Sequence, residues 1–388
     1  MFLTLITFII ILGLMVLVHE LGHFITAKRA GVKVEEFGFC LPPRVIGIYK
    51  DKNNKWKVAG PKTKETPTTI YSLNWIPLGG FVKIKGEQGE GAGEEDSFIT
   101  KGPGRRAWIL SSGVLMNVVL AMVLLAIGFY IGLPQLVDDQ DLYGAEISDE
   151  KIQIVEVIDR LPAQKEGAQM GDTLVSIDGQ KFNEIENIQN YVDEKIGQEI
   201  IIVLSRGQEE ITKTMVPELN PETGRAGLGV GLVKIAMVSY PWYLAIWQGI
   251  ITTIVLFKVI IIAFYELFRN LIISKEVVVD VAGPVGIAVL TGQVARLGFV
   301  YILQFAALLS LNLAIINFAP FPALDGGRVL FILIEKIRGK AVDQRVENFA
   351  HNLGFVLLML LIVVITFRDV SKVSTKFVGF LDYIKGIF

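Results

Sequence analysis

The sequence predicts a polytopic α-helical membrane protein with four transmembrane helices, a small inserted α+β domain and a membrane-associated β-hairpin. Of its 388 residues, 52% are hydrophobic, and the mean hydropathy is +0.51. This is too apolar for an ordinary soluble protein. Four apolar stretches are long enough to cross a hydrocarbon core of about 30 Å; they are residues 1–27, 107–137, 297–317 and 348–367.

Charge patterning predicts how these spans are oriented. Basic residues outnumber acidic ones between residues 28 and 106, and Lys28 and Arg29 directly follow the first span. Residues 134–240 are predominantly acidic. Because basic residues beside span ends mark cytoplasmic loops, we expect residues 28–106 inside the cell and residues 134–240 outside. The net charge of −2 gives no sign of a nucleic-acid partner. The apolar spans make the lipid bilayer the expected surroundings.

The first span carries the pattern H-E-x-x-H, formed by His19, Glu20 and His23. Histidines four residues apart share one helix face and can bind one metal ion. Glu20 lies beside that face, where its carboxylate could accept a proton from a water molecule on the metal. Ionisable groups at membrane depth cost roughly 2.5–3.5 kcal/mol each, which favours a functional interpretation. A chance occurrence is the alternative, and the apolar context argues against it.

A second polar group follows the third span, in the sequence N-F-A-P-F-P-A-L-D-G at residues 317–326. Pro320 and Pro322 interrupt regular helix. Irregular backbone at membrane depth is tolerated only where it is buried in protein or lines a water-filled cavity. Alone, Asp325 with its two glycines would indicate a turn, but in this context we expect it to be the third ligand of one catalytic Zn²⁺. Asn317 is a candidate donor to a substrate carbonyl or oxyanion.

These two motifs together resemble those of the site-2 protease family of intramembrane zinc metalloproteases, in its bacterial branch. The resemblance covers nearly the whole chain. Residues 106–117 are similar to the family's second span, although the Gly-Pro usual there is Gly113-Val114. The resemblance implies that His19, His23 and Asp325 bind one zinc ion and that Glu20 is the catalytic residue.

The same resemblance implies a setting and a substrate class. The protein would lie in the bacterial inner membrane, with its active site near the cytoplasmic side. It would take part in regulated intramembrane proteolysis by cutting transmembrane helices. The implied substrates are anti-sigma factors, other single-span regulators and signal-peptide remnants.

The inserted domain is predicted at residues 151–217. Its pattern indicates a strand at 152–158, a helix at 185–195 and strands near 199–205 and 210–216. This segment resembles a bacterial-type PDZ domain, with one copy in the chain. Such domains add an extended peptide to a sheet edge. We expect the domain on the extracytoplasmic side, where it could bind a peptide or substrate ectodomain. Passive exclusion of bulky ectodomains is an equal alternative.

A fifth apolar run, residues 239–268, is long enough to span the membrane but conflicts with the expected topology. The motifs of the first and third spans can meet only if both spans run from outside to inside. The chain must then begin and end outside between residues 134 and 297. We therefore expect this run to be an interfacial or re-entrant helix.

The cytoplasmic loop contains a predicted β-hairpin at residues 71–85, broken at Gly79 and Gly80. A protease must extend a helical substrate before cutting it. We expect the segment from Gly79 to Ile84, including Phe81 and Val82, to hold the extended substrate by strand addition near the metal. A hairpin that serves only for packing is the alternative.

Two rival functions remain open at this point. A catalytically inactive PDZ membrane adaptor would be expected to lack Glu20 or a ligand, and neither is missing. A zinc transporter would need polar ligands through several spans, and one such cluster is visible. His351 begins the last span, where we expect it to pack rather than bind metal.

Overall fold

The computed structural model describes residues 2–63, 66–87, 93–137, 143–158, 161–207, 209–219, 226–273, 283–340 and 342–385. The chain divides into two compact units, which are described separately. One unit contains Met1–Leu125, Gly249–Ala295 and Ile302–Phe388, and the other contains Ala126–Gln248 and Arg296–Tyr301.

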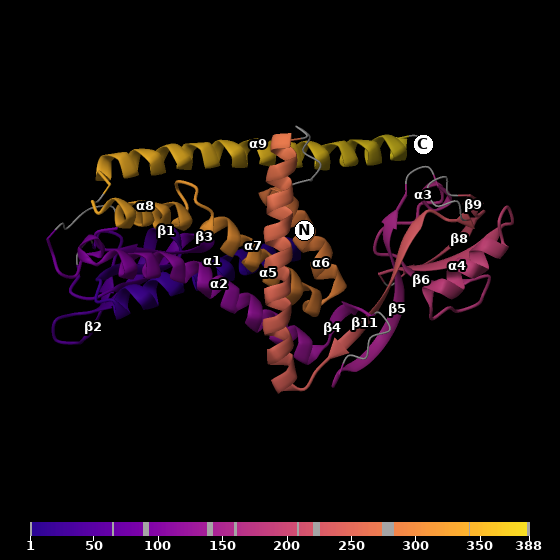
Figure 1. Cartoon of the computed structure of the whole chain (residues 1–388), viewed down its shortest axis with the longest axis horizontal. Coiled ribbons are helices and arrows are strands. Elements are labelled where there is room, and N and C mark those ends of the chain that lie inside the picture. The colour runs from indigo at the N-terminus through magenta and orange to yellow at the C-terminus, as the bar shows by residue number, and fades with distance from the viewer. Residues whose placement is uncertain are drawn as a thin grey trace. The chain divides into compact units, whose positions relative to one another are not determined.

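Within the described residues, five helices contain stretches that are long and apolar enough to cross a membrane. They are α1 (Phe2–Arg29), α2 (Pro103–Ile131), α5 (Trp242–Ile273), α7 (Phe299–Phe318) and α9 (Gln344–Lys385) (Figure 1). The chain is therefore a polytopic helical membrane protein, and four of these helices overlap the four predicted spans. Two shorter helices complete the helical part, α6 (Pro284–Leu297) and α8 (Asp325–Arg338).

Two helix predictions need correction. Helix α2 ends at Ile131 rather than at residue 137, because Gly132 has φ of +116° and strand β4 (Leu133–Leu136) begins immediately after it. The run at 239–268 cannot be re-entrant, since α5 continues without a reversal from Trp242 to Ile273. An interfacial position for α5 stays a prediction.

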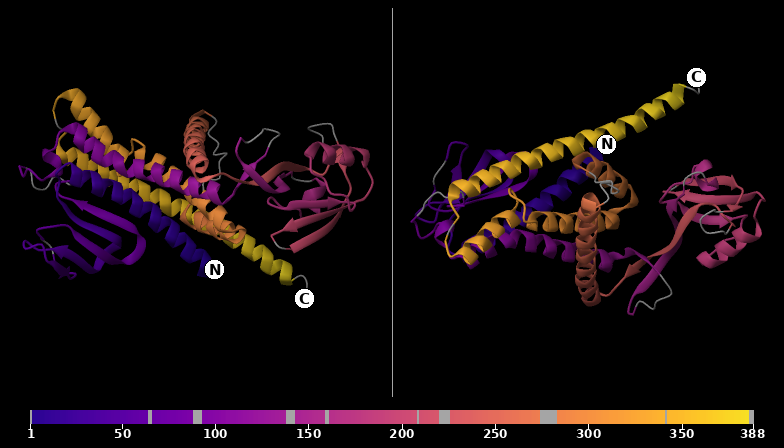
Figure 2. Two further views of the ribbon diagram at one scale, coloured as in Figure 1. Left: turned by 90° about the horizontal axis from the view of Figure 1, so that it is seen from below. Right: turned by 45° about the horizontal axis from the view of Figure 1, so that its top comes forward.

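Helices α1 and α2 run side by side and approach closely through small residues (Figure 2). A Cβ on Gly22 of α1 would lie 2.4 Å from the Ser112 carbonyl oxygen of α2. One turn further, the hydroxyl groups of Thr26 and Ser112 are 2.7 Å apart. Helix α7 joins α2 through the Ser310 hydroxyl, which donates to the Asn117 carbonyl at 2.8 Å. Small residues and hydroxyl contacts of this kind are typical of helix packing in membranes.

The loop between α1 and α2 forms a sheet instead of the predicted hairpin. Its strands are β1 (Val34–Lys50), β2 (Trp56–Ala59) and β3 (Ile70–Ile84), in the order β2-β1-β3, and a short 3-10 helix follows at Phe98–Thr100. The two halves of β3 both pair with β1, since Phe37 pairs with Val82 and also with Tyr71. The prediction of a self-paired hairpin at 71–85 was wrong because β1 supplies the partner for both halves.

The second unit contains a six-stranded sheet with the order β4-β11-β5-β6-β7-β8. Its further strands are β5 (Glu146–Val157), β6 (Thr173–Ile177), β7 (Ile200–Arg206), β8 (Glu209–Met215) and β11 (Val230–Ser239), with helices α3 (Pro162–Lys165) and α4 (Ile185–Glu194). A small two-stranded sheet is formed by β9 (Glu218–Leu219) and β10 (Ala226–Gly227).

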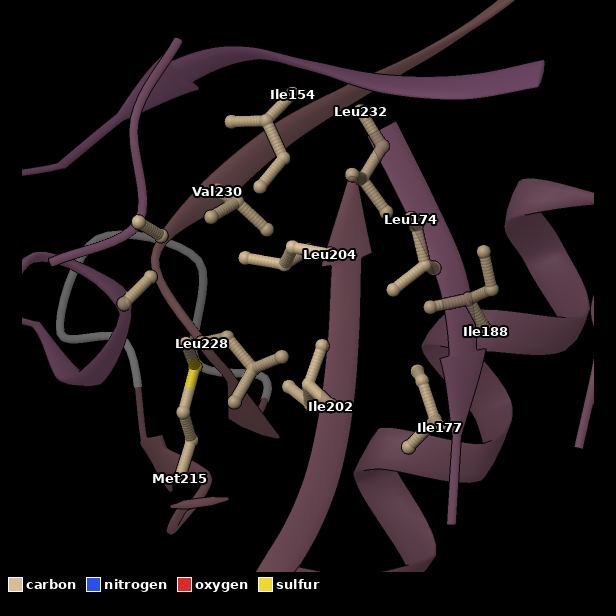
Figure 3. Close-up of a pocket in the computed structure, with 12 residues that line it drawn as sticks. Ile154, Leu174, Ile177, Ile188, Ile202, Leu204, Met215, Leu228, Val230 and Leu232 are labelled. Atoms are coloured by element: carbon tan, nitrogen blue, oxygen red, sulfur yellow. The ribbon is translucent and has the colours of Figure 1, made fainter. Parts of the chain in front are cut away.

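The main core cluster of this unit is formed by apolar side chains. Ile154, Leu174, Ile177, Ile188, Ile202 and Leu228 are among the side chains that converge between the strands and α4 (Figure 3). The predicted boundary at residue 217 is too early. Strand β11 pairs with β5 along its length, and Leu228 belongs to the same core.

An ion pair between a buried carboxylate and a half-exposed guanidinium joins the start of β6 to the end of β7. Asp172 is 1% exposed and accepts bonds of 2.7 Å from both Nε and Nη2 of Arg206. Burial alone would raise the pKa of Asp172. The hydrogen bonds from Arg206 and from the Gln169 amide outweigh it, so the pKa lies below its usual value.

Candidate metal centre

Helix α1 presents the two histidines of the H-E-x-x-H pattern on one face. His19 and His23 are each 6% exposed, and their rings meet edge to face with centroids 4.8 Å apart. The uninterrupted helix over this segment produces the arrangement, because positions four apart lie one above the other. Glu20, on the adjacent face, is half-buried.

The carboxylate of Asp325, at the start of α8, lies beside the two histidines of α1. Helix α7 ends at Phe318, and Asp325 is the first residue of α8 after a short irregular loop. The loop folds back tightly on α8. A Cβ on Gly326 would lie 2.2 Å from the Phe318 carbonyl oxygen, and one on Gly327 would lie 2.3 Å from that of Phe321. The two glycines after Asp325 therefore permit the turn that brings its carboxylate to α1.

The three side chains converge on one point. Asp325 Oδ2 is 3.0 Å from His19 Nε2 and 3.3 Å from His23 Nε2, and the two Nε2 atoms are 3.2 Å apart. Ligands about 2.0–2.1 Å from a tetrahedral zinc ion would be separated by roughly 3.3 Å. The spacing of these donor atoms therefore fits three corners of such a site, and His, His and Asp are a donor set that zinc accepts.

The hydrogen bonds behind His23 also fit a cation. Its Nδ1 lies 2.8 Å from the Ile109 carbonyl oxygen, which can only accept, so Nδ1 carries the proton. In the neutral ring Nε2 then presents a lone pair toward an anionic carboxylate oxygen. Such a contact is repulsive unless a positive charge lies between the two atoms. A metal-binding histidine typically has its other nitrogen bonded in this way.

Asn117 of α2 contacts the Nδ1 atom of His19, as the Ile109 carbonyl contacts that of His23. Its amide Nδ2 lies 3.3 Å from His19 Nδ1, while its Oδ1 is buried and has no partner among the described residues. A half-turn of the side-chain amide exchanges Nδ2 and Oδ1 without changing its shape. With the amide rotated, Oδ1 accepts from Nδ1–H, and His19 Nε2 is left free for a metal. This exchange satisfies the orphaned oxygen as well.

A cavity of about 150 Å³ opens beside the three side chains. Such a volume holds several water molecules. Glu20 and Asn317 line it together with His19 and Asp325, so four of the predicted site residues meet here. Pro320 and Pro322 are not among its lining residues; they belong to the loop that precedes Asp325.

The predicted substrate segment lies against α1 one turn before the histidines. A Cβ on Gly79, which has φ of +76°, would lie 2.6 Å from a Val16 methyl group. The corresponding atom on Gly80 would lie 3.4 Å from Leu17 Cδ1. Phe81 and Val82 follow in β3 and are half-buried. The glycines thus let β3 pack directly on the helix that carries His19.

Sequence reasoning missed the residues of α2 that surround the histidines. A Cβ on Gly113 would lie 2.5 Å from His23 Nε2 and 2.8 Å from His19 Cε1, so only glycine leaves room for both rings. Asn117 lies one turn further along α2 and is fully buried. The available signal was a polar residue and a glycine four positions apart in an apolar span.

Several apolar helices around a His-His-Asp group that could hold a metal ion are typical of a membrane-embedded metalloprotein. The model of peptidase family M50 matches residues 7–361, and the chain belongs to this family. A Clostridium perfringens protein named as a candidate zinc metalloprotease is 34% identical over 92% of this chain and 95% of its own length. The zinc metalloprotease RasP of Geobacillus kaustophilus is 28% identical over 95% of this chain and 98% of its own length. The protein is accordingly a zinc metalloprotease.

Among solved structures, the PDZ domain of an SdrC-like protein from Listeria monocytogenes is similar to part of the chain. The match covers 22% of this chain and 92% of the Listeria domain, with 21% sequence identity and a TM-score of 0.21.

We predict that substituting Gly113 by alanine removes zinc from the protein. The new methyl group would occupy the space of both histidine rings. Zinc per chain, measured by plasma mass spectrometry on the purified protein, should fall well below that of the unchanged chain. The control is Gly13→Ala in α1, where a Cβ meets nothing within 4 Å. Full zinc content in Gly113→Ala would contradict this packing.

Proposed function

We propose that this metalloprotease is an endopeptidase that cuts transmembrane segments of other membrane proteins. The observation that carries the proposal is the convergence of His19, His23 and Asp325 on one point, with Glu20 on the wall of the same cavity. Helices α1 and α7, which supply or lead to these residues, are apolar enough to lie in the bilayer. A peptide bond reaching this cavity would therefore belong to a membrane-embedded segment.

The side chains of the cavity have distinct tasks in this proposal. One zinc ion held by His19, His23 and Asp325 would supply the Lewis acid that activates water and polarises the scissile carbonyl. Glu20 would take the proton from the attacking water and deliver it to the leaving amine. Asn317 would donate its side-chain N–H to the developing oxyanion.

The rival functions find less support. An inactive adaptor would have no use for a carboxylate beside the ligand group, yet Glu20 is present in the cavity. A transporter would need a succession of ligand groups along a path. Among the described residues, one group of three or more metal-binding side chains is found, and it is this one. Proteolysis uses all the polar residues that the cavity presents.

The edge of β3 is the proposed docking line for the substrate. The segment from Gly80 to Ile84 pairs with β1 through residues such as Val82 and Phe81. It packs on α1 beside Leu17, two residues before His19. A substrate added to its other side as an extended strand would have its helix unwound near the metal. Packing alone is the alternative role of this strand.

The proposed substrates are single-span membrane proteins, including anti-sigma factors, other regulators and signal-peptide remnants, as the family resemblance implies. The PDZ-like domain would meet their extracytoplasmic parts, by binding a peptide or by excluding bulky ectodomains. The basic residues after α1, such as Lys28 and Arg29, support a cytoplasmic position for the loop between α1 and α2. In this topology α5 lies along the outer interface of a bacterial inner membrane.

We predict that Glu20→Gln abolishes cleavage while leaving zinc in place. The amide keeps the size of the side chain but cannot accept the proton, and general acid–base catalysis contributes about 10²–10⁴-fold in rate. The assay is co-reconstitution with a tagged single-span membrane protein, with cleavage followed by immunoblot and zinc by mass spectrometry. The control is Glu218→Gln, on a side chain that is 48% exposed in the second unit. Persistent cleavage at full zinc content would favour another function for the site.

We predict that a substrate bound by Glu20→Gln can be crosslinked to the β3 edge. Cysteine is placed at the exposed Lys83, and also near the scissile bond of the single-span substrate, in a background of Cys40→Ala. Disulfide formation should be efficient from position 83. The matched control places cysteine at Lys57 of β2, on the opposite edge of the same sheet, where no crosslink is expected. Equal crosslinking at the two positions would contradict strand addition.

We predict an extracytoplasmic position for the end of α5. A reporter enzyme that is active only outside the cytoplasm, fused after Asn270, should be active. A fusion after Lys62, in the loop between α1 and α2, should be inactive and serves as the control. Activity only of a cytoplasmic reporter at residue 270 would show that α5 crosses the membrane.

A further inference from the structure

The last helix contacts the loop that carries Asp325 through a histidine. The backbone N–H of Ala323, two residues before Asp325, donates to His351 Nδ1 at 2.9 Å. His351 lies in α9, and its ring also packs against that of Phe331 in α8, with centroids 5.7 Å apart. The residue is therefore held between the loop and the helix that follows it.

The conformation at Ala323 needs such a contact. Its φ is +81°, in the left-handed backbone region that L-residues other than glycine rarely adopt. Ala323 bears a side chain and so would relax to negative φ if nothing held it. Relaxation would rotate the chain just before Leu324 and Asp325, and the carboxylate would leave its position 3.0 Å from His19. The turn bond from the Leu324 N–H to the Phe321 carbonyl, 3.2 Å long, opposes this rotation, and the bond to His351 opposes it as well.

A second contact from α9 lies on the same face, one turn further along. A Cβ on Gly354 would lie 2.4 Å from the Pro322 carbonyl oxygen and 2.7 Å from its carbonyl carbon. The backbone of α9 thus packs directly on the residue before Ala323. Because the clashing atoms belong to the backbone of the loop, a side chain here would have to move the loop itself.

We propose that His351 is a positioning residue for the metal site, which fixes Asp325 by holding the Ala323 amide from α9. The inference rests on the proposal that Asp325 is a metal ligand. His351 itself lies outside the His19-His23-Asp325 group and is not offered as a ligand. With Nδ1 accepting, the proton of the neutral ring is on Nε2, which is buried without a partner among the described residues. His351 is among the residues lining a polar cavity of about 290 Å³, which has room for a water molecule to bind this nitrogen.

The test measures zinc affinity of the full-length protein in detergent, by competition with a coloured chelator. His351→Leu removes the acceptor, and we expect affinity to fall about tenfold or more, as is typical when a residue supporting a ligand is lost. His351→Asn places Oδ1 near the position of Nδ1 and should stay within about threefold of the unchanged protein. Asn352→Leu, on the next and exposed residue of α9, is the matched control and should have no effect.

A second variant tests the neighbouring contact between α9 and the loop without changing the histidine. Gly354→Ala should push the Pro322 carbonyl away from α9 and also weaken zinc binding by about tenfold. Gly13→Ala serves as its control. If His351→Leu fails to fold, which size-exclusion chromatography would reveal, the zinc affinity of Gly354→Ala decides whether the proposal stands. Normal zinc affinity in Gly354→Ala or in folded His351→Leu, or equal losses in His351→Asn and His351→Leu, would overturn the proposal.

Asp325→Ala separates this inference from the function on which it rests. If Asp325→Ala binds zinc normally, Asp325 is not a ligand and both proposals fail. If Asp325→Ala loses zinc while His351→Leu keeps it, only the role of His351 is refuted.

Discussion

The close approach of α1 and α2 is the constraint on which the metal centre depends. Gly22 brings the two backbones together, and Gly113 leaves space for both imidazole rings. Only at this separation can the Ile109 carbonyl reach His23 Nδ1 and the Asn117 amide reach His19. A membrane interior offers few other partners to a ring nitrogen, so α2 supplies them. The two histidines that we propose as metal ligands are thus oriented by a helix that contributes no proposed ligand.

The sequence indicated the three candidate ligands more readily than the residues that surround them. His19 and His23 stand out because helical periodicity alone places them on one face, and Asp325 because two prolines precede it. The roles of Gly113 and Asn117 depend on which helix packs against α1. The spacing of residues along one segment does not predict which helix packs against it. The four apolar stretches were equally evident, whereas the fifth was ambiguous, because a spanning and an interfacial helix can have the same hydropathy.

Strand pairing set the limit for the remaining predictions. Strand-forming residues were evident at 71–85, but their partner is β1, which pairs with both halves of β3. In the second unit the strands at 152–158, 199–205 and 210–216 were predicted locally, but β6 was not. Strand β11 joins the sheet by pairing with β5, far earlier in the chain. In both cases the element was predictable and its neighbour was not. Long-range pairing is decided by burial of a shared face, which a single sequence does not display.

The loop before Asp325 shows how the site combines local strain with distant support. Prolines at 320 and 322 prevent α7 from continuing, and the two glycines after Asp325 let α8 start against the carbonyls of Phe318 and Phe321. These features allow the turn but do not fix its end, because Ala323 remains in an unfavourable conformation. The Leu324 N–H donates to the Phe321 carbonyl across Ala323 at 3.2 Å, and α9 adds a second bond from outside the loop. Any displacement of α9 would therefore move Asp325, the third proposed ligand, while His19 and His23 kept their contacts with α2.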